Sequence, residues 1–246
     1  MIDMNGFKGV SIVTGAVTET SSLQGTIDYI LANCEKSDIA QIIIGYPDRA
    51  TPECLGTIKQ IEAETEGVEV ITFLQKREKL GFLTEAFDKA NGSHVITVDS
   101  DMALDLSLIP VMIENAKKEP ETIFSASRWL GGNKFYGYNK FRKLLNSCAQ
   151  KFLSVLYASD LTDFTIPYQI IPTHILQSIE FEETNFPIFL EMVLKPLRLG
   201  YKFKELPTDC YSRKEGKSSN SFAQIPQYLR TALHVRFMSK EDILKK

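Results

Sequence analysis

The chain has 246 residues, of which 43% are hydrophobic and 24% charged, as expected for one large α/β domain or one domain with a small appendage. Its net charge of −3 gives no basic field of the kind that nucleic-acid-binding proteins need. The four cysteines form no CxxC pair, which argues against a disulfide framework or a zinc site. With no secretory leader and no run of about 20 apolar residues, we expect a protein of the cytoplasm or the cytoplasmic face of a membrane.

The first half of the chain alternates predicted strands with predicted helices. The strands are expected at residues 9–15, 40–45, 68–74 and 94–99. The helices are expected from the Ser/Thr-rich segment 16–22 to residue 33, over residues 52–66 and over residues 81–91. Three strand–helix units closed by a fourth strand predict a doubly wound, mostly parallel sheet. The sequence has neither GxGxxG nor GxxxxGK[ST], which argues against a dinucleotide fold of that type and against a P-loop.

The fourth predicted strand, which begins at His94, ends in two carboxylates, Asp99 and Asp101. Ligands of open α/β sheets bind beyond the carboxyl ends of the strands, so both side chains are expected at the mouth of a crevice. Two carboxylates at such a short separation repel each other unless a proton or a cation lies between them. A hard divalent ion, Mg²⁺ or Mn²⁺, held also by a diphosphate would satisfy them. A solvated strand end with two acidic residues is the alternative, because Asp-x-Asp is common by chance.

The second half continues with helices and strands in a less regular order. Helices are expected at residues 106–118, 138–158 and 185–199, and strands at residues 122–128 and 201–207. The polar run 212–220 is expected to be a loop, and the tail from residue 222 to be helical. We therefore expect one α/β domain over residues 1–220. Residues 221–246 would pack on that domain, on a partner or on a membrane surface.

Five motifs in the chain occur in the order found in a known family. They are SIVTGAVTETSSL (11–23), GFLTEAFDKANGSHVITVDSD (81–101), SRWLGGN (127–133), DFTIPYQ (163–169) and RKEGKSS (213–219). Together they resemble the glycosyltransferases of family 2, nucleotide-sugar-dependent enzymes with the GT-A fold. The motifs of the second half are most similar to the dolichol-phosphate mannose synthase-like branch. The resemblance implies an inverting transfer of a hexose from a GDP- or UDP-linked sugar to a polyprenyl (dolichol-type) phosphate.

The same resemblance implies roles for individual residues. Asp99 and Asp101 would hold Mn²⁺ or Mg²⁺ on the leaving diphosphate. Gln150 or Gln169 could add a further ligand, since amide oxygens suit hard cations, and both glutamines also fit solvated polar positions of a helix or loop. The implied donor-binding residues are Ala16, Glu19, Asp48, Arg77, Asp99 and Ser100, with Lys76 as an alternative to Arg77. The implied acceptor or phosphate-binding residues are Arg128, Arg142, Asp163, Arg213, Lys217 and Ser218. Asp163 fits equally a structural role in the acceptor loop, and each arginine alone fits a solvated surface.

Two positions depart from the family pattern. The second strand ends in Gly45 and Tyr46, where the family usually has paired aspartates, one of which contacts the nucleobase. Asp48 is the nearest carboxylate that could replace them. The usual Ser-Gly-Phe-Arg after the Asp163/Thr165 pair is replaced here by residues 166–169, Ile-Pro-Tyr-Gln. Recognition of the base and of the acceptor is therefore expected to differ from the family pattern.

The acceptor decides whether the reaction needs a general base. A lipid phosphate is already ionised near neutral pH, whereas a saccharide hydroxyl must lose a proton to a carboxylate, for which Glu191 is the candidate. Glu191 fits equally a glutamate on a helix surface. A non-catalytic nucleotide-sugar-binding protein is the third hypothesis, and the presence of both Asp99 and Asp101 argues against it.

The apolar side of the predicted helix 138–158, which has lysines and an arginine nearby, allows two interpretations. It fits packing on the sheet, and it fits an interfacial helix in contact with lipid. The C-terminal tail allows the same two interpretations, and packing against another subunit as a third.

Overall fold

Runs of β-branched residues form the centre of the sheet. The computed structural model describes residues 6–102, 105–131, 140–210 and 224–246. Among them, strands β1 (Val10–Gly15), β2 (Ile39–Tyr46) and β4 (His94–Thr97) are almost entirely buried along their length. Strands covered on both faces by helices lose the alternation of polar and apolar residues, which is why these segments read as continuous apolar runs.

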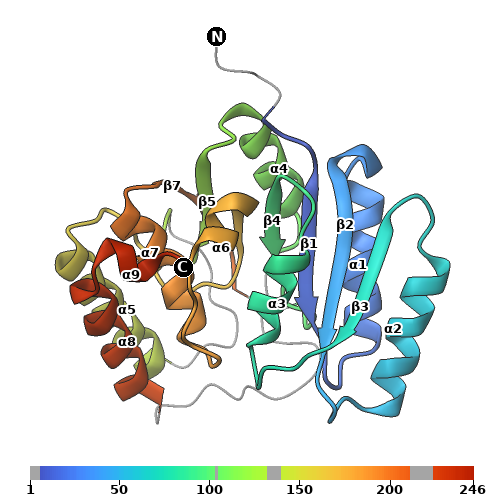
Figure 1. Cartoon of the computed structure of the whole chain (residues 1–246), viewed down its shortest axis with the longest axis horizontal. Helices are drawn as coiled ribbons and strands as arrows, with labels where there is room; N and C mark the ends of the chain where they lie inside the picture. Colours follow the sequence, from blue (N-terminus) through green and yellow to red (C-terminus); the bar gives the residue numbers. More distant parts are fainter. Residues whose placement is uncertain (1–5, 103–104, 132–139, 211–223) are drawn as a thin grey trace.

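The remaining elements follow in the order seen in Figure 1. The other strands are β3 (Glu69–Leu74), β5 (Thr122–Ser127), β6 (Gln169–Pro172) and β7 (Lys202–Pro207). The helices before β6 are α1 (Ser21–Asn33), the 3₁₀ turn η1 (Lys36–Asp38), α2 (Pro52–Glu64), α3 (Phe82–Lys89), α4 (Leu108–Lys118) and α5 (Lys140–Tyr157). Those after it are α6 (Thr173–Ser178), α7 (Ile188–Leu199), α8 (Ile225–Phe237) and α9 (Lys240–Ile243).

The described strands form one seven-stranded sheet in the order β3-β2-β1-β4-β6-β5-β7. All neighbouring pairs are parallel except those of β6, which runs antiparallel to β4 and β5. The carboxyl ends of β1, β2 and β4 therefore lie at one edge of the sheet, at the bottom of Figure 1. This edge is where the chain places its acidic motif.

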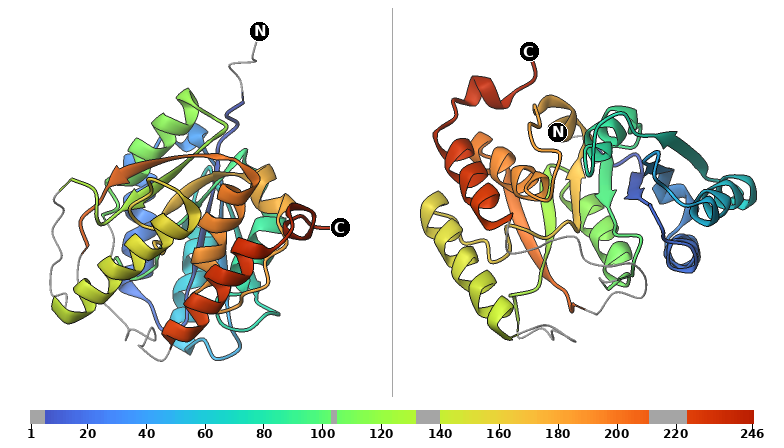
Figure 2. Two further views of the ribbon diagram at one scale, coloured as in Figure 1. Left: turned by 90° about the vertical axis from the view of Figure 1, so that its left-hand side faces the viewer. Right: turned by 90° about the horizontal axis from the view of Figure 1, so that it is seen from below.

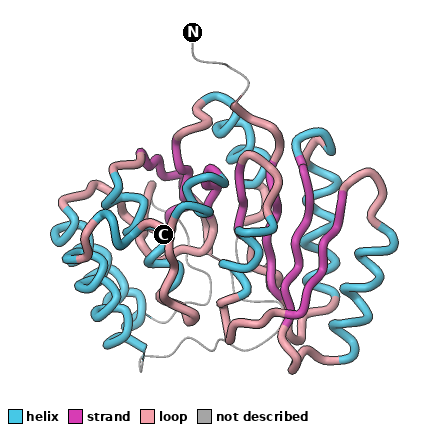
Figure 3. The backbone as a smooth tube through the Cα atoms, in the orientation of Figure 1, coloured by secondary structure: helices cyan, strands magenta, loops and turns pink. Residues whose placement is uncertain are grey.

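Helices cover both faces of the sheet, as the coloured tube in Figure 3 also shows. One core contains the buried sides of α1, α2 and α4, and the core on the opposite face contains those of α3, α6 and α7. A third cluster joins α5 and α8 to α7, so α5 and α8 form an outer layer at one side of the molecule (Figure 2). In the part of the chain that is described, no helix is both long and apolar enough to cross a membrane.

The doubly wound, mostly parallel sheet predicted from the sequence is confirmed. The antiparallel strand β6 was not predicted, because its four residues are too few for a periodic pattern and α6 follows it directly. The helical tail contacts the rest of the chain through α7, and the N–H of Glu180 donates to the carbonyl of Ile243 at 2.9 Å. The division at residue 220 remains a prediction.

Glycines at the ends of β1 and β2 make room for an aromatic side chain. A Cβ atom placed on Gly15 would lie 2.5 Å from Cζ of Phe82, and one on Gly45 would lie 2.8 Å from its Cδ2. Phe82 opens helix α3 and is itself only 7% exposed, so the ring has little room to move aside. The fold therefore links these two glycines to a large residue at position 82.

We expect Gly15→Ala to lower the free energy of unfolding by about 1–3 kcal/mol, as overpacking of a filled core does. Urea denaturation measures the change, and Gly15→Ala combined with Phe82→Leu should recover part of it. Gly56 is the matched control, because nothing lies within 4 Å of a Cβ placed there in α2. Gly56→Ala should raise stability by about 0.5–1 kcal/mol through helix propensity. Equal effects of the two glycine substitutions would refute the steric explanation.

Candidate active site

Backbone hydrogen bonds continue beyond the strands and hold the acidic motif against β1. Gly15 pairs with Gly45 in the register of β1 and β2, and the N–H of Ala16 donates to the Gly45 carbonyl at 3.1 Å. The Ser100 hydroxyl, between the two aspartates, donates to the Gly15 carbonyl at 2.7 Å. The turn that carries Asp99 and Asp101 is thus fixed at the end of β1.

A cleft of about 430 Å³ opens at this edge of the sheet. Five of the predicted site residues line it, namely Ala16, Glu19, Asp99, Ser100 and Asp101. The opposite wall comes from the second half of the chain and includes Asn185, Phe186, Phe189 and Gln224. The cleft therefore lies between the first and the second half of the chain.

The acidic pair fits a divalent cation. Asp101 is only 4% exposed and Asp99 is half-buried, and buried carboxylates are retained in proteins when they are paired or bind a metal. Among the described residues, no group of three or more His, Cys, Asp or Glu side chains is placed to hold a metal ion. Two carboxylates are nevertheless the usual protein share of a Mg²⁺ site, in which substrate phosphates and water supply the other oxygens.

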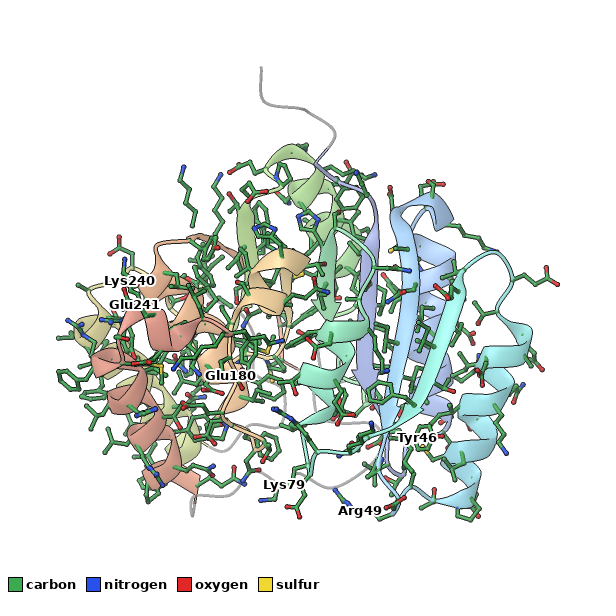
Figure 4. All side chains as sticks on the ribbon, viewed as in Figure 1. Tyr46, Arg49, Lys79, Glu180, Lys240 and Glu241 are labelled. Carbon is green, nitrogen blue, oxygen red and sulfur yellow. The ribbon has the colours of Figure 1, made fainter. Side chains whose placement is uncertain are left out.

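Two basic residues at the cleft were not predicted from the sequence. Arg49 follows β2 and Lys79 follows β3, and both side chains lie at the lower edge of the molecule in Figure 4. Lys79 has a left-handed backbone (φ 54°), as does Met102 (φ 55°) directly after Asp101. Such conformations in residues other than glycine concentrate at functional sites. Neither residue was predicted, because an exposed basic residue in a turn carries no distinct sequence pattern.

The remaining wall near β1 and β2 is apolar. Phe82 lies against Gly15 and Gly45 and lines the cleft together with Val13 and Leu83. A carboxylate at position 45 would collide with the Phe82 ring, which gives a physical reason for the absence of the family's aspartates there. Asp48 is exposed and lies outside the cleft lining, whereas its neighbour Arg49 is part of it.

Two carboxylates hold the loops that follow β1 and β3. Glu19 accepts hydrogen bonds from the N–H groups of Val17 and Thr18 at 2.8 and 3.0 Å. Glu85 accepts from the N–H groups of Lys76 and Arg77 at 2.9 and 2.8 Å. The Arg77 guanidinium donates to the Phe181 carbonyl at 3.4 Å, so it joins the loop after β3 to the second half of the chain. Arg77 does not line the cleft.

Arg128 and Asp163, two of the predicted acceptor residues, bind each other. Arg128 Nε donates to Asp163 Oδ2 at 2.7 Å and its Nη2 donates to Oδ1 at 2.8 Å, and the Asp163 side chain is fully buried. Gln150, the proposed further metal ligand, accepts from the N–H of Phe164 at 2.8 Å and donates to Thr165 Oγ1 at 3.0 Å. These contacts hold the DFTIPYQ segment in place, and neither Arg128, Asp163 nor Gln150 lines the cleft.

Cys210 is a half-buried thiol at the end of the described range that begins with α5. Burial raises the pKa of the Cys210 thiol, Arg128 lowers it, and Asp163, Asp101 and Asp99 raise it further. Cys210 and Gln224 are the described residues on either side of residues 211–223. Arg213, Lys217, Ser218 and the side chain of Arg142 lie outside the described part of the chain.

Glu191 is not a surface residue, and that interpretation of its helix position is wrong. It is 1% exposed, and its Oε1 lies 2.6 Å from Nζ of the fully buried Lys195. It also accepts hydrogen bonds from the N–H groups of Glu182 and Glu183 at 3.3 and 2.8 Å. Burial raises the pKa of Glu191, while Lys195 opposes the increase. The carboxylate therefore fixes the segment that leads to the cleft wall, and it does not line the cleft.

Comparison with known proteins identifies a family. The model of the family described as glycosyl transferase family 2 matches residues 11–179. The chain is 20% identical over 207 residues to glycosyltransferase AglD of Haloferax volcanii, covering 81% of this chain and 32% of that protein. It is 24% identical over 165 residues to a dolichol-phosphate mannosyltransferase of Pyrococcus furiosus, covering 66% of this chain and 46% of that protein. The chain thus spans less than half the length of these relatives.

Solved structures confirm the fold. A glucosyl-3-phosphoglycerate synthase from Mycobacterium tuberculosis, in complex with Mn²⁺, UDP and phosphoglyceric acid, has a TM-score of 0.71 at 13% identity. The match covers 96% of this chain and 81% of that one. The same enzyme in complex with Mg²⁺ and UDP also has a TM-score of 0.71, at 14% identity, and is covered to 82%. The predicted α/β fold of the GT-A type is therefore confirmed.

The ion pair of Glu191 and Lys195 gives a test of their supporting role. Lys195→Met leaves a buried carboxylate without its cation, and we expect a loss of about 3–5 kcal/mol in the free energy of unfolding. Lys195→Met combined with Glu191→Leu should recover most of that loss, because it removes both charges. Lys245→Met is the control: it removes an exposed 2.7 Å ion pair with Asp88 and should change stability by about 0–1 kcal/mol. Equal losses in the two lysine variants would contradict the role of the pair.

Proposed function

This chain belongs to glycosyl transferase family 2, and we propose that it transfers a hexose, with inversion, from a nucleoside diphosphate sugar to a polyprenyl (dolichol-type) phosphate. The observation that carries the proposal is the position of Asp99 and Asp101, at the carboxyl end of β4 and at the wall of a cleft between the two halves of the chain. The family match and the order of the motifs support the same reaction.

The charges around the cleft suit a metal-bound diphosphate. Asp99 and Asp101 would hold Mn²⁺ or Mg²⁺, which when bound stabilises negative charge on the leaving diphosphate as a Lewis acid. Arg49 and Lys79 add positive charge at the rim, where a diphosphate would gain charge-assisted hydrogen bonds. The solved relatives with Mn²⁺ or Mg²⁺ and UDP support a donor of this class.

The nucleobase would be bound differently from the usual family pattern. With glycine at position 45, the end of β2 offers no carboxylate to the base, and Phe82 fills that space. An aromatic ring can contact any base through its face, because every base has a π surface. Gln75, which follows β3 and also lines the cleft, is an amide that could read a base edge. We therefore leave UDP and GDP as alternatives for the donor nucleotide.

A phosphate acceptor agrees with the environment of Glu191. An ionised phosphate oxygen attacks the anomeric carbon without losing a proton, so the reaction needs no general base. Glu191, the candidate base for a saccharide hydroxyl, is already occupied by Lys195 and two backbone N–H groups. One relative is named a dolichol-phosphate mannosyltransferase, and one solved relative contains phosphoglyceric acid, so phosphate-bearing acceptors occur among both.

Arg128, Arg142, Arg213, Lys217 and Ser218 are the candidates to bind the acceptor phosphate or the diphosphate. Arg213 is the strongest candidate for this phosphate contact, because a guanidinium in a Gly/Ser-rich segment can bind a phosphate with two hydrogen bonds. A lipid-linked acceptor would place the enzyme at the cytoplasmic face of a membrane or with a membrane partner protein.

Donor binding can be tested by thermal shift. UDP, GDP and their sugar conjugates are each added with and without Mn²⁺, and a ligand that binds only the native state raises the Tm by mass action. We expect one nucleotide to give a Mn²⁺-dependent increase that Asp101→Asn abolishes. Asp28→Asn, an exposed change on α1, should leave the increase intact. No increase with any nucleotide would refute the donor assignment, and binding without transfer or hydrolysis would favour a non-catalytic binding protein.

The acceptor can be tested with Arg213. We expect Arg213→Ala to lower the rate of transfer to a polyprenyl phosphate by at least about tenfold, the value of hydrogen bonds to a charged group. Lys214→Ala, which removes a basic side chain at the neighbouring position, should have little effect on the rate of transfer. The nucleotide-induced Tm shift of each variant shows whether donor binding is retained. A slower transfer with an unchanged shift therefore means that the acceptor site is affected. An unchanged rate in Arg213→Ala, together with loss in Glu191→Gln at unchanged donor binding, would favour a saccharide hydroxyl as acceptor.

A further inference from the structure

Large apolar side chains are exposed on two helices far more than elsewhere in the described chain. Twelve large apolar residues are exposed in that part of the chain, and nine of them lie on α5 and α8. On α5 they are Phe141, Leu144, Leu145, Phe152 and Val155. On α8 they are Ile225, Leu229, Leu233 and Phe237. Contiguous exposed apolar surface of this kind marks an interaction site.

The two helices present these side chains from neighbouring positions on one side of the molecule. The Tyr157 hydroxyl donates to the Ala232 carbonyl at 2.7 Å, and Arg236 Nε donates to the Leu156 carbonyl at 2.9 Å. Both views in Figure 2 show α5 and α8 next to each other at the outside of the molecule. We call the exposed sides of α5 and α8 together the outer helix face.

The exposure follows helical periodicity. On α5 the exposed apolar residues recur at spacings of three, four and seven, while Gln150 and Leu153 on the other side are buried in the protein. Val155 is 83% exposed and Phe237 is 80% exposed, so these side chains project from the helices without covering one another. The inner side of α5 packs in the cluster that it shares with α7 and α8, and this packing leaves the exposed apolar side of α5 unexplained.

The outer helix face is basic although the chain as a whole is acidic. Neither α5 nor α8 contains an Asp or a Glu, and together they carry six Lys or Arg residues in a chain of net charge −3. Lys140 and Lys151 are exposed on α5, and Arg230 is exposed on α8. On the α8 side of the face, Leu229, Arg230, Leu233 and Phe237 line a groove that they share with the acidic residues Glu180, Glu182 and Asp242. Glu182 contacts His234 at 3.0 Å and Lys195 at 3.6 Å.

We propose that the outer helix face docks on an anionic lipid bilayer, with its apolar side chains at the boundary of head groups and acyl chains. Helices with an apolar side flanked by Lys and Arg lie in that boundary, and binding strengthens with anionic lipid. A second copy of the chain fits less well, because an isologous contact would place two basic faces against each other. The proposal does not depend on the identity of the acceptor.

The position of the outer helix face agrees with a lipid-borne substrate. Gln224, the residue before α8, lines the cleft, and Ile225 is the first exposed apolar residue of the face. Docking of α8 on a bilayer would therefore bring the cleft next to the lipid head groups.

Vesicle flotation tests the proposal with the whole chain. We expect it to float with vesicles of equal parts phosphatidylcholine and phosphatidylglycerol, to float less with phosphatidylcholine alone, and to dissociate as salt increases. The double change Phe141→Ser with Val155→Ser, and separately Lys140→Glu with Lys151→Glu, should weaken binding to the anionic vesicles by at least about tenfold. The controls are Leu74→Ser with Val111→Ser, and Lys59→Glu with Lys202→Glu, which make equal changes at exposed positions elsewhere.

The control variants and the face variants should all keep the wild-type Tm and the nucleotide-induced Tm shift, so a failure of lipid binding is distinguishable from a failure of the proposed donor chemistry. Equal loss in face and control variants, or wild-type binding by both face variants, would overturn the proposal. A concentration-dependent dimer in sedimentation velocity that the change at Val155 dissociates, without binding to vesicles, would show that the face joins copies of the chain.

Discussion

Asp99 and Asp101 follow a strand that is buried on both faces, so their charge can be accommodated only where that strand leaves the sheet. The register of β1, β2 and β4 brings three strand ends to the same edge, and the Ser100 hydroxyl bonds the turn to Gly15. The cleft, its basic rim and its apolar wall all surround this point. Parallel pairing of short buried strands is thus the constraint that brings the site together.

The second half of the chain is organised by three carboxylates, the buried Asp163 and Glu191 and the half-buried Glu205, which accept hydrogen bonds from the backbone. Asp163 accepts from Arg128, Glu191 accepts from two N–H groups before α7, and Glu205 accepts from the N–H groups of Thr162 and Asp163 at 2.8–3.0 Å. Each carboxylate holds an irregular segment that the sheet itself does not hold. Residues that the sequence suggested for substrate binding or catalysis, such as Asp163 and Glu191, can therefore instead stabilise the segments behind the cleft wall.

The sequence was sufficient for the first half of the fold, because buried strands and amphipathic helices have periodic patterns. It was insufficient for β6, whose antiparallel direction depends on distant partners, and for Arg49 and Lys79, whose proximity exists only after folding. Glu191 and Lys195 have a helical i,i+4 spacing that was visible, but their burial under α8 and the segment before α7 was not. Asp99 and Asp101 were predicted from their place at a strand end, and Ala16, Glu19 and Ser100 from the resemblance to the family; all five line the cleft.

The contact of Phe82 with Gly15 and Gly45 also constrains how this site can change over generations. A carboxylate can be introduced at position 45 only after Phe82 has been replaced by a smaller residue. In the reverse order, the protein with both the carboxylate and Phe82 would have an overpacked core. A smaller residue at 82 leaves a void beside two glycines until position 45 is filled. The order of substitutions is therefore limited, and homologous chains should show positions 15, 45 and 82 changing together.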